Sequence, residues 1–196
     1  MKRFKKWLET RKPVLSSINK RQEMTLAEKV QLPEPKIKLD DGQIVTLSIA
    51  IEADIPDILR IQKLSYNGLT PWGEGALRRE LTHNKRALYL IAKDQKEAVG
   101  FIGTWFIDGE SHITNIAVVP EKRRNGLAYW LIKNIIYLAE QENMKHLSLE
   151  VRVSNKQAQN LYLKLGFKKL EIKKGYYAGD HEDALEMSLP LLRMRG

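Results

Sequence analysis

The sequence predicts a mixed α/β fold, an α+β arrangement in which a mixed, mostly antiparallel sheet carries helices on both faces. Two observations predict this class. Apolar runs of strand length follow one another in the middle of the chain, and segments with helical periodicity lie before and after them. The resulting order is strand, two helices, three strands, helix, strand, helix and two strands, which implies one sheet covered on both sides. The chain has 196 residues and 43% hydrophobic content, enough for one core of ordinary size.

The regular pattern begins at residue 44. The β-branched run at 44–51 predicts a strand, and residues 54–65 predict a helix that Asp54 can cap. A turn containing glycine and proline follows at 67–73, and a short helix is predicted at 76–83. We expect four apolar side chains of the first helix to lie near one face: Ile55, Ile58, Leu59 and Leu64.

Three apolar runs follow, at residues 87–92, 98–107 and 113–119, and polar turns separate them. This pattern predicts an antiparallel meander. The elements predicted after the meander are a helix at 129–140, a strand at 146–153, a helix at 155–165 and strands near 167–172 and 184–189.

Residues 1–42 differ in kind from the rest, and we predict that they form a basic N-terminal extension, partly helical or flexible, before a domain at 43–196. The first 40 residues hold 11 Lys and Arg against 5 Asp and Glu, which supplies +6 of the formal net charge of +9. A basic amphipathic surface here would suit an anionic partner such as ribosomal RNA or a membrane face. A solvated arm is the favoured alternative. The apolar residues with roughly helical spacing are Phe4, Trp7, Leu8, Leu15 and Ile18.

The composition excludes several kinds of site. The chain has no cysteine, so disulfides, thiolate metal sites and cysteine nucleophiles are excluded. Its histidines have no spacing that would gather them on a metal, so we expect no metal and interpret each as a surface or packing residue. No apolar run is long enough to span a bilayer, so we expect no transmembrane segment and a cytoplasmic location. The four histidines are His83, His112, His146 and His181.

The segment at 123–128 is the first candidate binding site. A strand that ends in a basic, glycine-containing turn and leads directly into a helix leaves unpaired backbone N–H groups at the positive end of the helix dipole. Such a site suits a pyrophosphate, and Gly126 keeps the backbone accessible. The segment lacks the Gly-Lys-Ser/Thr ending of a nucleotidase loop and the further glycines of a dinucleotide fold. From these residues alone, a solvated basic turn is an equally good interpretation. The segment reads Arg123, Arg124, Asn125, Gly126, Leu127 and Ala128.

The second candidate site lies on the strand at 146–153 and the helix after it. Alternation along this strand points the leucines and Val151 one way and Ser148 and Glu150 the other. Tyr162 lies one turn before Gly166 on the helix that Asn155 starts, so carboxylate and phenol can meet across a crevice. Taken alone, Glu150 is better interpreted as a solvated strand residue, and Tyr162 as a half-buried core aromatic.

Several of these segments together resemble the GNAT family, the GCN5-related N-acetyltransferases. The resemblance covers about residues 44–191 and includes the turn Thr70-Pro71-Trp72, which is similar to the family's substrate-side loop. More narrowly, the chain resembles the RimI type, the ribosomal-protein alanine N-acetyltransferases. It departs from the family in having Ala128 where many relatives have glycine, and in its N-terminal arm. The matching motifs are Asn115-Ile116-Ala117-Val118 with Pro120, Arg123-x-x-Gly126-x-Ala128, Leu149-Glu150-Val151-Arg152 with Asn155, Leu161-Tyr162 with Leu165-Gly166-Phe167, and Tyr176-Tyr177 with Glu182-Asp183-Ala184.

The resemblance implies a GNAT fold with acetyl-CoA as cosubstrate. It assigns Glu150 as general base and Tyr162 as general acid. It also implies that Trp72, Tyr176 and Tyr177 shape the acceptor site. Cofactor contacts are implied for Ile116 and Val118, whose backbone would pair with the pantetheine arm, for Ala117 and Val118 near the oxyanion, for Arg123, Arg124, Asn125, Gly126, Leu127, Ala128 and Tyr129 around the pyrophosphate, and for Asn155.

The expected reaction is direct attack of a neutral amine on the thioester in a ternary complex. An α-amino group with a pKa near 8 is already partly neutral at cellular pH, whereas a lysine near about 10.4 demands more of the base. This favours a protein N-terminus as acceptor, such as the N-terminal alanine of a small-subunit ribosomal protein. A lysine or small amine is an alternative, and an RNA- or ribosome-docking module with a vestigial core is another. Because an ordinary glutamate, with a pKa of about 4.3, is a weak base, we expect Glu150 to act through water or to have its pKa raised by burial.

Overall fold

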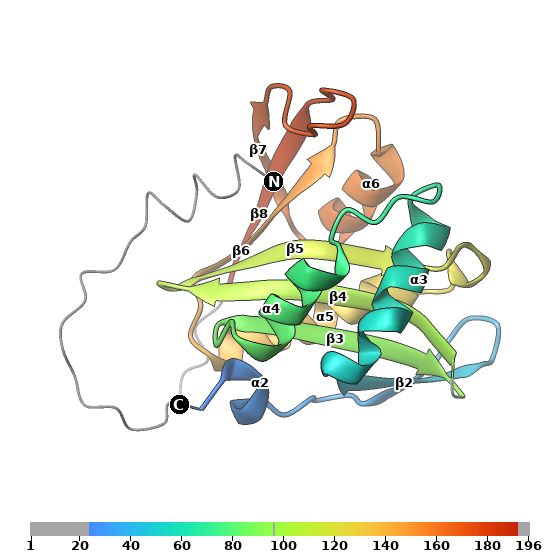
Figure 1. Cartoon of the computed structure of the whole chain (residues 1–196). Helices are drawn as coiled ribbons and strands as arrows, with labels where there is room; N and C mark the ends of the chain where they lie inside the picture. The colour runs from blue at the N-terminus through green and yellow to red at the C-terminus, as the bar shows by residue number, and fades with distance from the viewer. Residues whose placement is uncertain (1–23, 96, 192–196) are drawn as a thin grey trace.

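A sheet of eight strands forms the centre of the computed structural model, which describes residues 24–95 and 97–191 (Figure 1). The strand order is β1-β2-β3-β4-β5-β6-β8-β7, and each neighbouring pair is antiparallel except β5 and β6, which are parallel. The strands are β1 Lys36–Lys38, β2 Ile44–Ile49, β3 Ala87–Asp94, β4 Glu97–Ile107, β5 Glu110–Val118, β6 His146–Arg152, β7 Lys168–Lys173 and β8 Ala184–Pro190.

Helices cover both faces of this sheet. Figure 1 shows α3 and α4 in front of the central strands and α5 behind them, while α6 lies beside the β6–β8 end. The predicted fold class and the antiparallel meander of β3, β4 and β5 are therefore confirmed. The helices are α2 Leu26–Lys29, α3 Ile55–Ser65, α4 Glu74–Thr82, α5 Leu127–Gln141 and α6 Lys156–Lys164, with 3₁₀ turns at η1 Glu52–Asp54 and η2 Pro120–Lys122.

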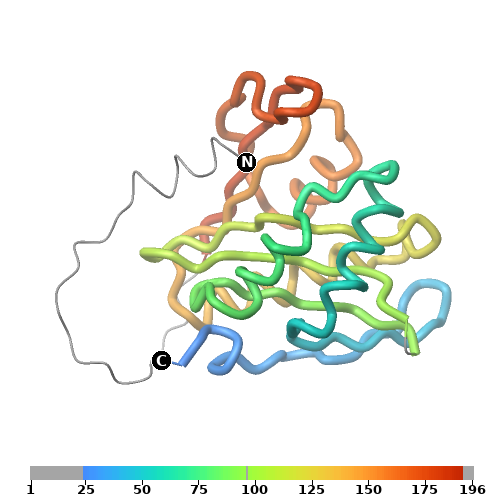
Figure 2. Tube along the Cα trace, viewed as in Figure 1, coloured from blue at the N-terminus to red at the C-terminus, as the bar shows by residue number. Residues whose placement is uncertain are grey.

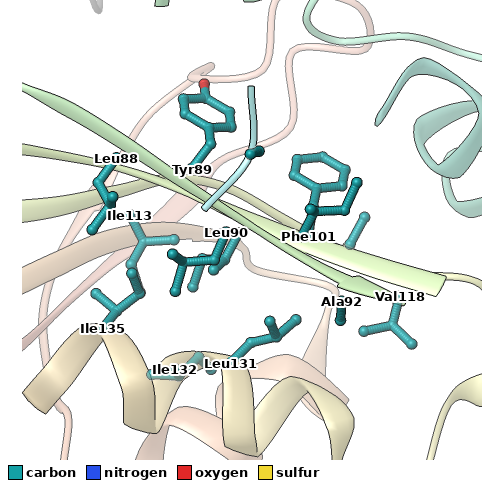
Figure 3. Close-up of a cluster of buried hydrophobic side chains, with 14 of the residues drawn as sticks. Leu88, Tyr89, Leu90, Ala92, Phe101, Ile113, Val118, Leu131, Ile132 and Ile135 are labelled. Atoms are coloured by element: carbon teal, nitrogen blue, oxygen red, sulfur yellow. The ribbon is translucent and has the colours of Figure 1, made fainter. Parts of the chain in front are cut away.

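The central strands are apolar on both faces because both faces are covered. Figure 3 shows Leu90 and Ala92 of β3 pointing toward α5, on the side of the sheet where Leu131 and Ile132 of that helix lie in the same core cluster. Tyr89, which precedes Leu90 in the sequence, points to the opposite side, as the alternation of a strand requires. This arrangement explains why the runs at 87–92 and 98–107 read as continuous rather than alternating hydrophobic segments.

Gly103 of β4 is a site of close packing within this core. A Cβ atom at Gly103 would lie 2.4 Å from Cε1 of Tyr89, which is itself fully buried on β3. We therefore expect Gly103→Ala to lower the free energy of unfolding by about 1–3 kcal/mol, the usual cost of overpacking a core. Urea denaturation measures this. The control is Gly75→Ala in α4, where the added methyl group meets no atom within 4 Å. Equal stability of both variants would contradict the prediction.

Two details of the first long helix differ from the sequence prediction. Asp54 occupies the N-cap position of α3, but its side chain makes no cap hydrogen bond to that helix. It instead accepts from the backbone N–H of Ile51 at 2.9 Å and pairs with Nζ of Lys93 at 2.7 Å. Leu64 was expected on the buried face but is 46% exposed, because the helical spacing places it on a different side of α3 from the buried Ile58 and Gln62. Ile61 is the residue that is fully buried at this end of the helix.

Part of the predicted N-terminal extension lies within the described residues. Strand β1 pairs antiparallel with β2 across the turn at 40–42, and Leu26 and Leu39 are buried against the core. The turn lies next to the loop that precedes α5 (Figure 2), where Nδ2 of Asn125 donates to Oδ2 of Asp41 at 3.0 Å. The division at residue 42 stays a prediction. The predicted amphipathic residues Phe4 to Ile18 lie outside the described part of the chain.

Candidate active site

Strands β5 and β6 separate partway along their length. Their parallel pairing runs from Glu110 with His146 to Ile113 with Leu149 and then ends. Strand β5 continues to pair with β4 as far as Val118, and β6 continues to pair with β8. The second half of β5 therefore presents a strand edge toward a split in the sheet.

Backbone groups of Ile116 and Val118 face this split. Val119 N–H donates to Val99 of β4 at 2.9 Å, and backbone groups alternate in direction along a strand, so Ile116 and Val118 point away from β4. Their carbonyl oxygens accept hydrogen bonds from side chains at the end of α3 and from Arg123 in the loop after β5. Tyr66 Oη donates to Ile116 at 3.0 Å, and Ser65 Oγ and Arg123 Nε donate to Val118 at 3.1 and 3.0 Å. This edge is where the sequence predicts pairing with an extended pantetheine arm.

The glycine turn lies at the end of this edge and opens α5. Gly126 is the N-cap with φ of +81°, in the left-handed region that favours glycine, and an added Cβ would meet no atom within 4 Å. The first turn of α5 begins Leu127-Ala128-Tyr129, so its N–H groups have neither helical acceptors nor an acidic neighbour within that turn. The open space, the N–H groups and the dipole together fit a phosphate group. The guanidinium of Arg123 is directed back to Val118 instead.

Glu150 is nearly buried on β6 among positive groups. Its Oε1 accepts from Nζ of Lys173 at 2.7 Å, and its Oε2 lies 3.1 Å from Nε2 of His112. Burial alone would raise the pKa of Glu150, but the interactions with His112 and Lys173 outweigh it and lower the pKa to about 2. Of the two alternatives expected for Glu150, a pKa raised by burial is therefore wrong, because the sequence does not show that His112 and Lys173 contact the carboxylate. Action through water stays a prediction.

Four tyrosines lie around the split next to Glu150. Burial, with the neighbouring Tyr66 and Tyr177, raises the pKa of Tyr162, so this phenol keeps its proton. Burial also raises the pKa of Tyr66 to about 12. Burial and an interaction with Glu150 raise the pKa of Tyr176. Burial also raises the pKa of Tyr177, although the charge of Arg152 acts in the opposite direction. Tyr177 interacts with both Glu150 and Tyr162, so the proposed base and the proposed acid lie in one cluster of side chains.

The predicted acceptor-side residues lie on two separately held loops. Trp72 is fixed by the fully buried amide of Gln62, which accepts from its N–H and donates to its carbonyl, both at 2.9 Å. On the second loop Tyr176 and Tyr177 contact edge to face, and Arg152 lies 4.0 Å above the Tyr177 ring. Arg152 also pairs with Asp180 and Glu182 at 2.7 and 2.6 Å, which ties this loop to the end of β6.

Asn155 begins α6 as predicted, and its Oδ1 accepts from Ala158 N–H at 3.1 Å. The residues that the sequence did not single out are Gln62, Tyr66 and Lys173, together with the pairing of His112. Of the four histidines, His83, His146 and His181 are exposed, as a surface interpretation expects, but His112 is buried against β6. Only the strand register brings it there, since 36 positions separate it from Ser148.

Two findings apply to the described residues alone. In residues 24–95 and 97–191, no helix is both long and apolar enough to cross a bilayer. Within the same part of the chain, no three histidine or acidic side chains gather in a way that could hold a metal ion.

Residues 55–167 match the acetyltransferase (GNAT) family, and this match spans more than half of the chain. The chain therefore belongs to the GNAT family: it is an acetyltransferase, and its cosubstrate is acetyl-CoA. The split, the strand edge and the glycine turn described above fit this cosubstrate.

Several relatives are similar over most of their length. The [ribosomal protein bS18]-alanine N-acetyltransferase of Salmonella typhimurium is 35% identical over 148 residues, 74% of this chain and 97% of the relative. An N-alpha-acetyltransferase of Saccharolobus solfataricus is 33% identical over 165 residues, covering 78% and 96% of the two chains. The crystal structure of the ribosomal-protein-S18-alanine N-acetyltransferase from Escherichia coli has a TM-score of 0.69 and 31% identity, and covers 78% of this chain and 96% of that one.

Proposed function

We propose that this acetyltransferase moves the acetyl group of acetyl-CoA to the N-terminal α-amine of a protein, and that the acceptor is the N-terminal alanine of a small-subunit ribosomal protein. The similarity to enzymes named for that substrate supports the proposal, because it extends over nearly the whole length of those enzymes. An acceptor of this kind would place the enzyme in the cytoplasm, where ribosomal proteins are made.

The observation that carries the proposal is the buried Glu150 carboxylate at the split between β5 and β6, where contacts with Lys173 and His112 lower its pKa to about 2. A carboxylate this acidic does not remove a proton from a resting lysine, whose pKa is about 10.4. An α-amine with a pKa near 8 supplies its own neutral form at cellular pH. Its proton becomes strongly acidic only once the N–C bond forms, and Glu150 can then accept it, directly or through a water molecule.

The remaining roles are those that the resemblance to the GNAT family implies, and the positions of the side chains support them. We propose that the turn at 123–129 binds the pyrophosphate and that Ile116 and Val118 pair with the pantetheine arm, with Asn155 a further cofactor contact. The N–H of Val118 would stabilise the oxyanion, whereas that of Ala117 points toward β4, and Trp72, Tyr176 and Tyr177 would enclose the acceptor peptide. Tyr162 donates its proton to the departing thiolate, which balances the proton that the amine loses.

Substitution of Tyr162 tests the acid role. We expect Tyr162→Phe to lower kcat by about a hundredfold or more, as loss of a proton donor does, with the affinity for acetyl-CoA nearly unchanged because the ring is kept. Steady-state kinetics and calorimetry measure the two quantities. Tyr137→Phe, an exposed tyrosine on α5, is the matched control and should retain full activity. Unchanged turnover in Tyr162→Phe would remove this residue from the acid role.

The acceptor is tested by mass spectrometry of acetyl transfer into a peptide panel. One peptide begins with alanine, others begin with bulkier residues, and lysine peptides are blocked at the N-terminus. We expect acetylation of the α-amine, fastest at alanine. Transfer to the blocked lysine peptides at an equal rate would instead support the alternative, acetylation of a lysine or small amine.

Contact of the basic N-terminal extension with RNA or the ribosome stays a separate proposal. It is based on the excess of Lys and Arg in the first 40 residues. If it holds, deletion of residues 1–23 should weaken RNA binding and reduce its salt dependence, with acetyl transfer to a short peptide unaffected. RNA binding equal to that of the full chain would contradict it.

A further inference from the structure

A row of buried polar side chains lies beneath the loop that carries Trp72, on α3 and β5. Gln62 is fully buried, and its carboxamide accepts from the N–H of Trp72 and donates to the carbonyl of the same residue, both at 2.9 Å. Nδ2 of Asn115 lies 3.5 Å from Oε1 of Gln62, and Oδ1 of Asn115 accepts from Oη of Tyr66 at 3.0 Å. The row thus leads from the loop to Tyr66, whose hydroxyl also lies 3.0 Å from the carbonyl oxygen of Ile116.

The backbone of this loop has few other hydrogen bonds. Within the described part of the chain, no hydrogen bond between backbone groups involves residues 70–72, and Pro71 has no N–H to offer. The backbone bonds before and after this segment only close the turns at the end of α3 and the start of α4. Gln62, ten positions earlier on α3, therefore supplies the two bonds that fix both the place and the orientation of the Trp72 backbone.

The ring of Trp72 is held separately. It meets the ring of Trp105 edge to face, with the centroids 6.2 Å apart and the planes at 87°. Trp105 is 4% exposed, and its Nε1–H donates to the carboxylate of Glu80 on α4. Trp72 itself is only partly buried, so part of its surface remains open to a ligand. The loop thus presents an aromatic surface that is fixed through its backbone and from behind its ring.

The amide of Gln62 is unusual for so deeply buried a position. Burying an amide costs free energy unless its N–H and C=O groups find partners, so a fully buried site on a helix ordinarily favours a hydrocarbon side chain. At Gln62 the two bonds of ordinary length both go to Trp72. The amide therefore serves the loop, which is the loop that the sequence predicts on the acceptor side.

We propose that Gln62 is a positioning residue of the acceptor site: its carboxamide holds Trp72 in place relative to the edge of β5, so that the acceptor peptide meets the thioester of acetyl-CoA. This inference rests on the proposed function, in which Trp72 encloses the acceptor peptide and Ile116 pairs with the pantetheine arm. Gln62 touches neither substrate, because it is fully buried. Through Asn115 and Tyr66 the same row reaches the edge of β5, so hydrogen bonds beneath the surface join the loop to that edge.

The position of the loop matters because the reaction has two substrates. Amine and thioester must approach to about 3–3.5 Å, and a displacement of about 1 Å costs up to about a hundredfold in rate. The proposed contacts of acetyl-CoA lie on β5 and on the glycine turn, and neither is held by Gln62. Loss of the Gln62 bonds should therefore affect the acceptor and leave the binding of acetyl-CoA unchanged.

The first test asks whether Gln62 holds the loop, and it needs no acceptor. Gln62→Met keeps an unbranched side chain of similar length and removes both bonds. In hydrogen exchange followed by NMR on the full chain, we expect the N–H of Trp72 to exchange slowly in the wild type and about tenfold faster in the variant. The amides of β3 and β4 should stay protected in both proteins, which shows that the variant is folded. Equal exchange at Trp72 in the two proteins would overturn the proposal.

The second test is kinetic, with the peptide that the wild type acetylates fastest. We expect Gln62→Met to raise KM for this peptide by about tenfold, because the peptide must order a loop that the amide no longer holds. KM for acetyl-CoA should not change. A rise in both KM values by the same factor, or in neither, would indicate a merely structural role and overturn the proposal.

The control for Gln62→Met is Thr104→Val. Thr104 is also fully buried, and its hydroxyl donates to the carbonyl of Leu88 at 3.0 Å, so the variant likewise loses a buried hydrogen bond to the backbone. It follows Gly103 and precedes Trp105 on β4, so its side chain points to the face of the sheet opposite Trp105 and the loop. We expect lower stability and unchanged KM values for both substrates.

The wild type alone shows whether the proposed function fails. If it transfers acetyl only to lysine peptides or small amines, the proposed acceptor is wrong, and the kinetic test of Gln62 uses that amine. If it transfers acetyl to no amine, the proposed function fails as a whole, and hydrogen exchange still decides whether Gln62 holds the loop. The inference about Gln62 fails when Gln62→Met behaves like the wild type.

Discussion

Replacement of Gly126 by glutamate should weaken the binding of acetyl-CoA by about a hundredfold. Part of the loss comes from the backbone, because φ of +81° costs a residue with a side chain about 1–2 kcal/mol. The rest comes from repulsion between the carboxylate and the phosphates, worth about 1–4 kcal/mol near a protein surface. Each 1.4 kcal/mol is a factor of about ten in affinity. Isothermal titration calorimetry with acetyl-CoA measures the loss.

Two further variants separate these causes. Gly126→Ala adds the backbone strain without the charge, in space that is open within 4 Å, and should lose about tenfold or less. Gly109→Glu introduces the same side chain at φ of +82° in the turn at the other end of β5, and should leave acetyl-CoA affinity unchanged. If Gly126→Glu binds acetyl-CoA as tightly as the wild type, the glycine turn is not the phosphate site.

Local patterns were enough to predict most of the fold. The apolar runs that became β3, β4 and β5 are long and bounded by turns, and Asn155 caps α6 through its own side chain. These features depend on neighbours a few positions away. Asp54 has the same capping potential, but the partner that competes for it is Lys93, 39 positions distant on β3. Leu64 is exposed because it lies nine positions after Ile55, half a rotation away on the helix, and the grouping of its apolar neighbours on one face was drawn too widely.

In the candidate site, too, local patterns predicted the motifs but not the contacts between residues that are distant in the sequence. The glycine turn, Glu150 and Tyr162 stand out in the sequence because each belongs to a motif, and their roles remain predictions. The pairing of His112 with Ser148 and Glu150 depends on the parallel register of β5 and β6, which no local pattern encodes. The pKa of Glu150 follows from that pairing and from Lys173, so one of the two alternatives predicted for this residue, a pKa raised by burial, does not hold.

The low pKa also affects stability. Because the folded-state pKa of Glu150 lies near 2, below the ordinary value of 4.5, its ionised form stabilises the fold above about pH 4.5. This contribution is lost as the pH falls toward 2. Acid therefore removes the charge through which Glu150 of β6 contacts His112 and Lys173, and the proposed mechanism uses the same charge.

Replacement of Glu150 by glutamine should abolish most of the activity and restore part of it at high pH. Removing a proton acceptor costs about 10²–10⁴-fold, and the loss should be largest near pH 7, where most of an α-amine with a pKa near 8 is protonated. As the pH rises through about 9 the amine deprotonates unaided, and the variant should recover relative to the wild type. Steady-state rates against pH measure this. A flat ratio of variant to wild type would assign Glu150 a positioning role.

The control for Glu150→Gln is Glu186→Gln. Glu186 lies directly opposite Glu150 on β8 and also pairs with Lys173, at 2.9 Å, so its removal takes one negative charge from the same cluster. It leaves His112 and Glu150 in contact, and we expect most of the activity to remain. Thermal unfolding should separate the effect on chemistry from the effect on stability. Glu150→Gln leaves the half-buried Lys173 with less compensation at pH 7, and the variant should lose less stability on acidification than the wild type. Equal loss of activity in both variants would mean that the charge of the cluster matters, and the position of Glu150 does not.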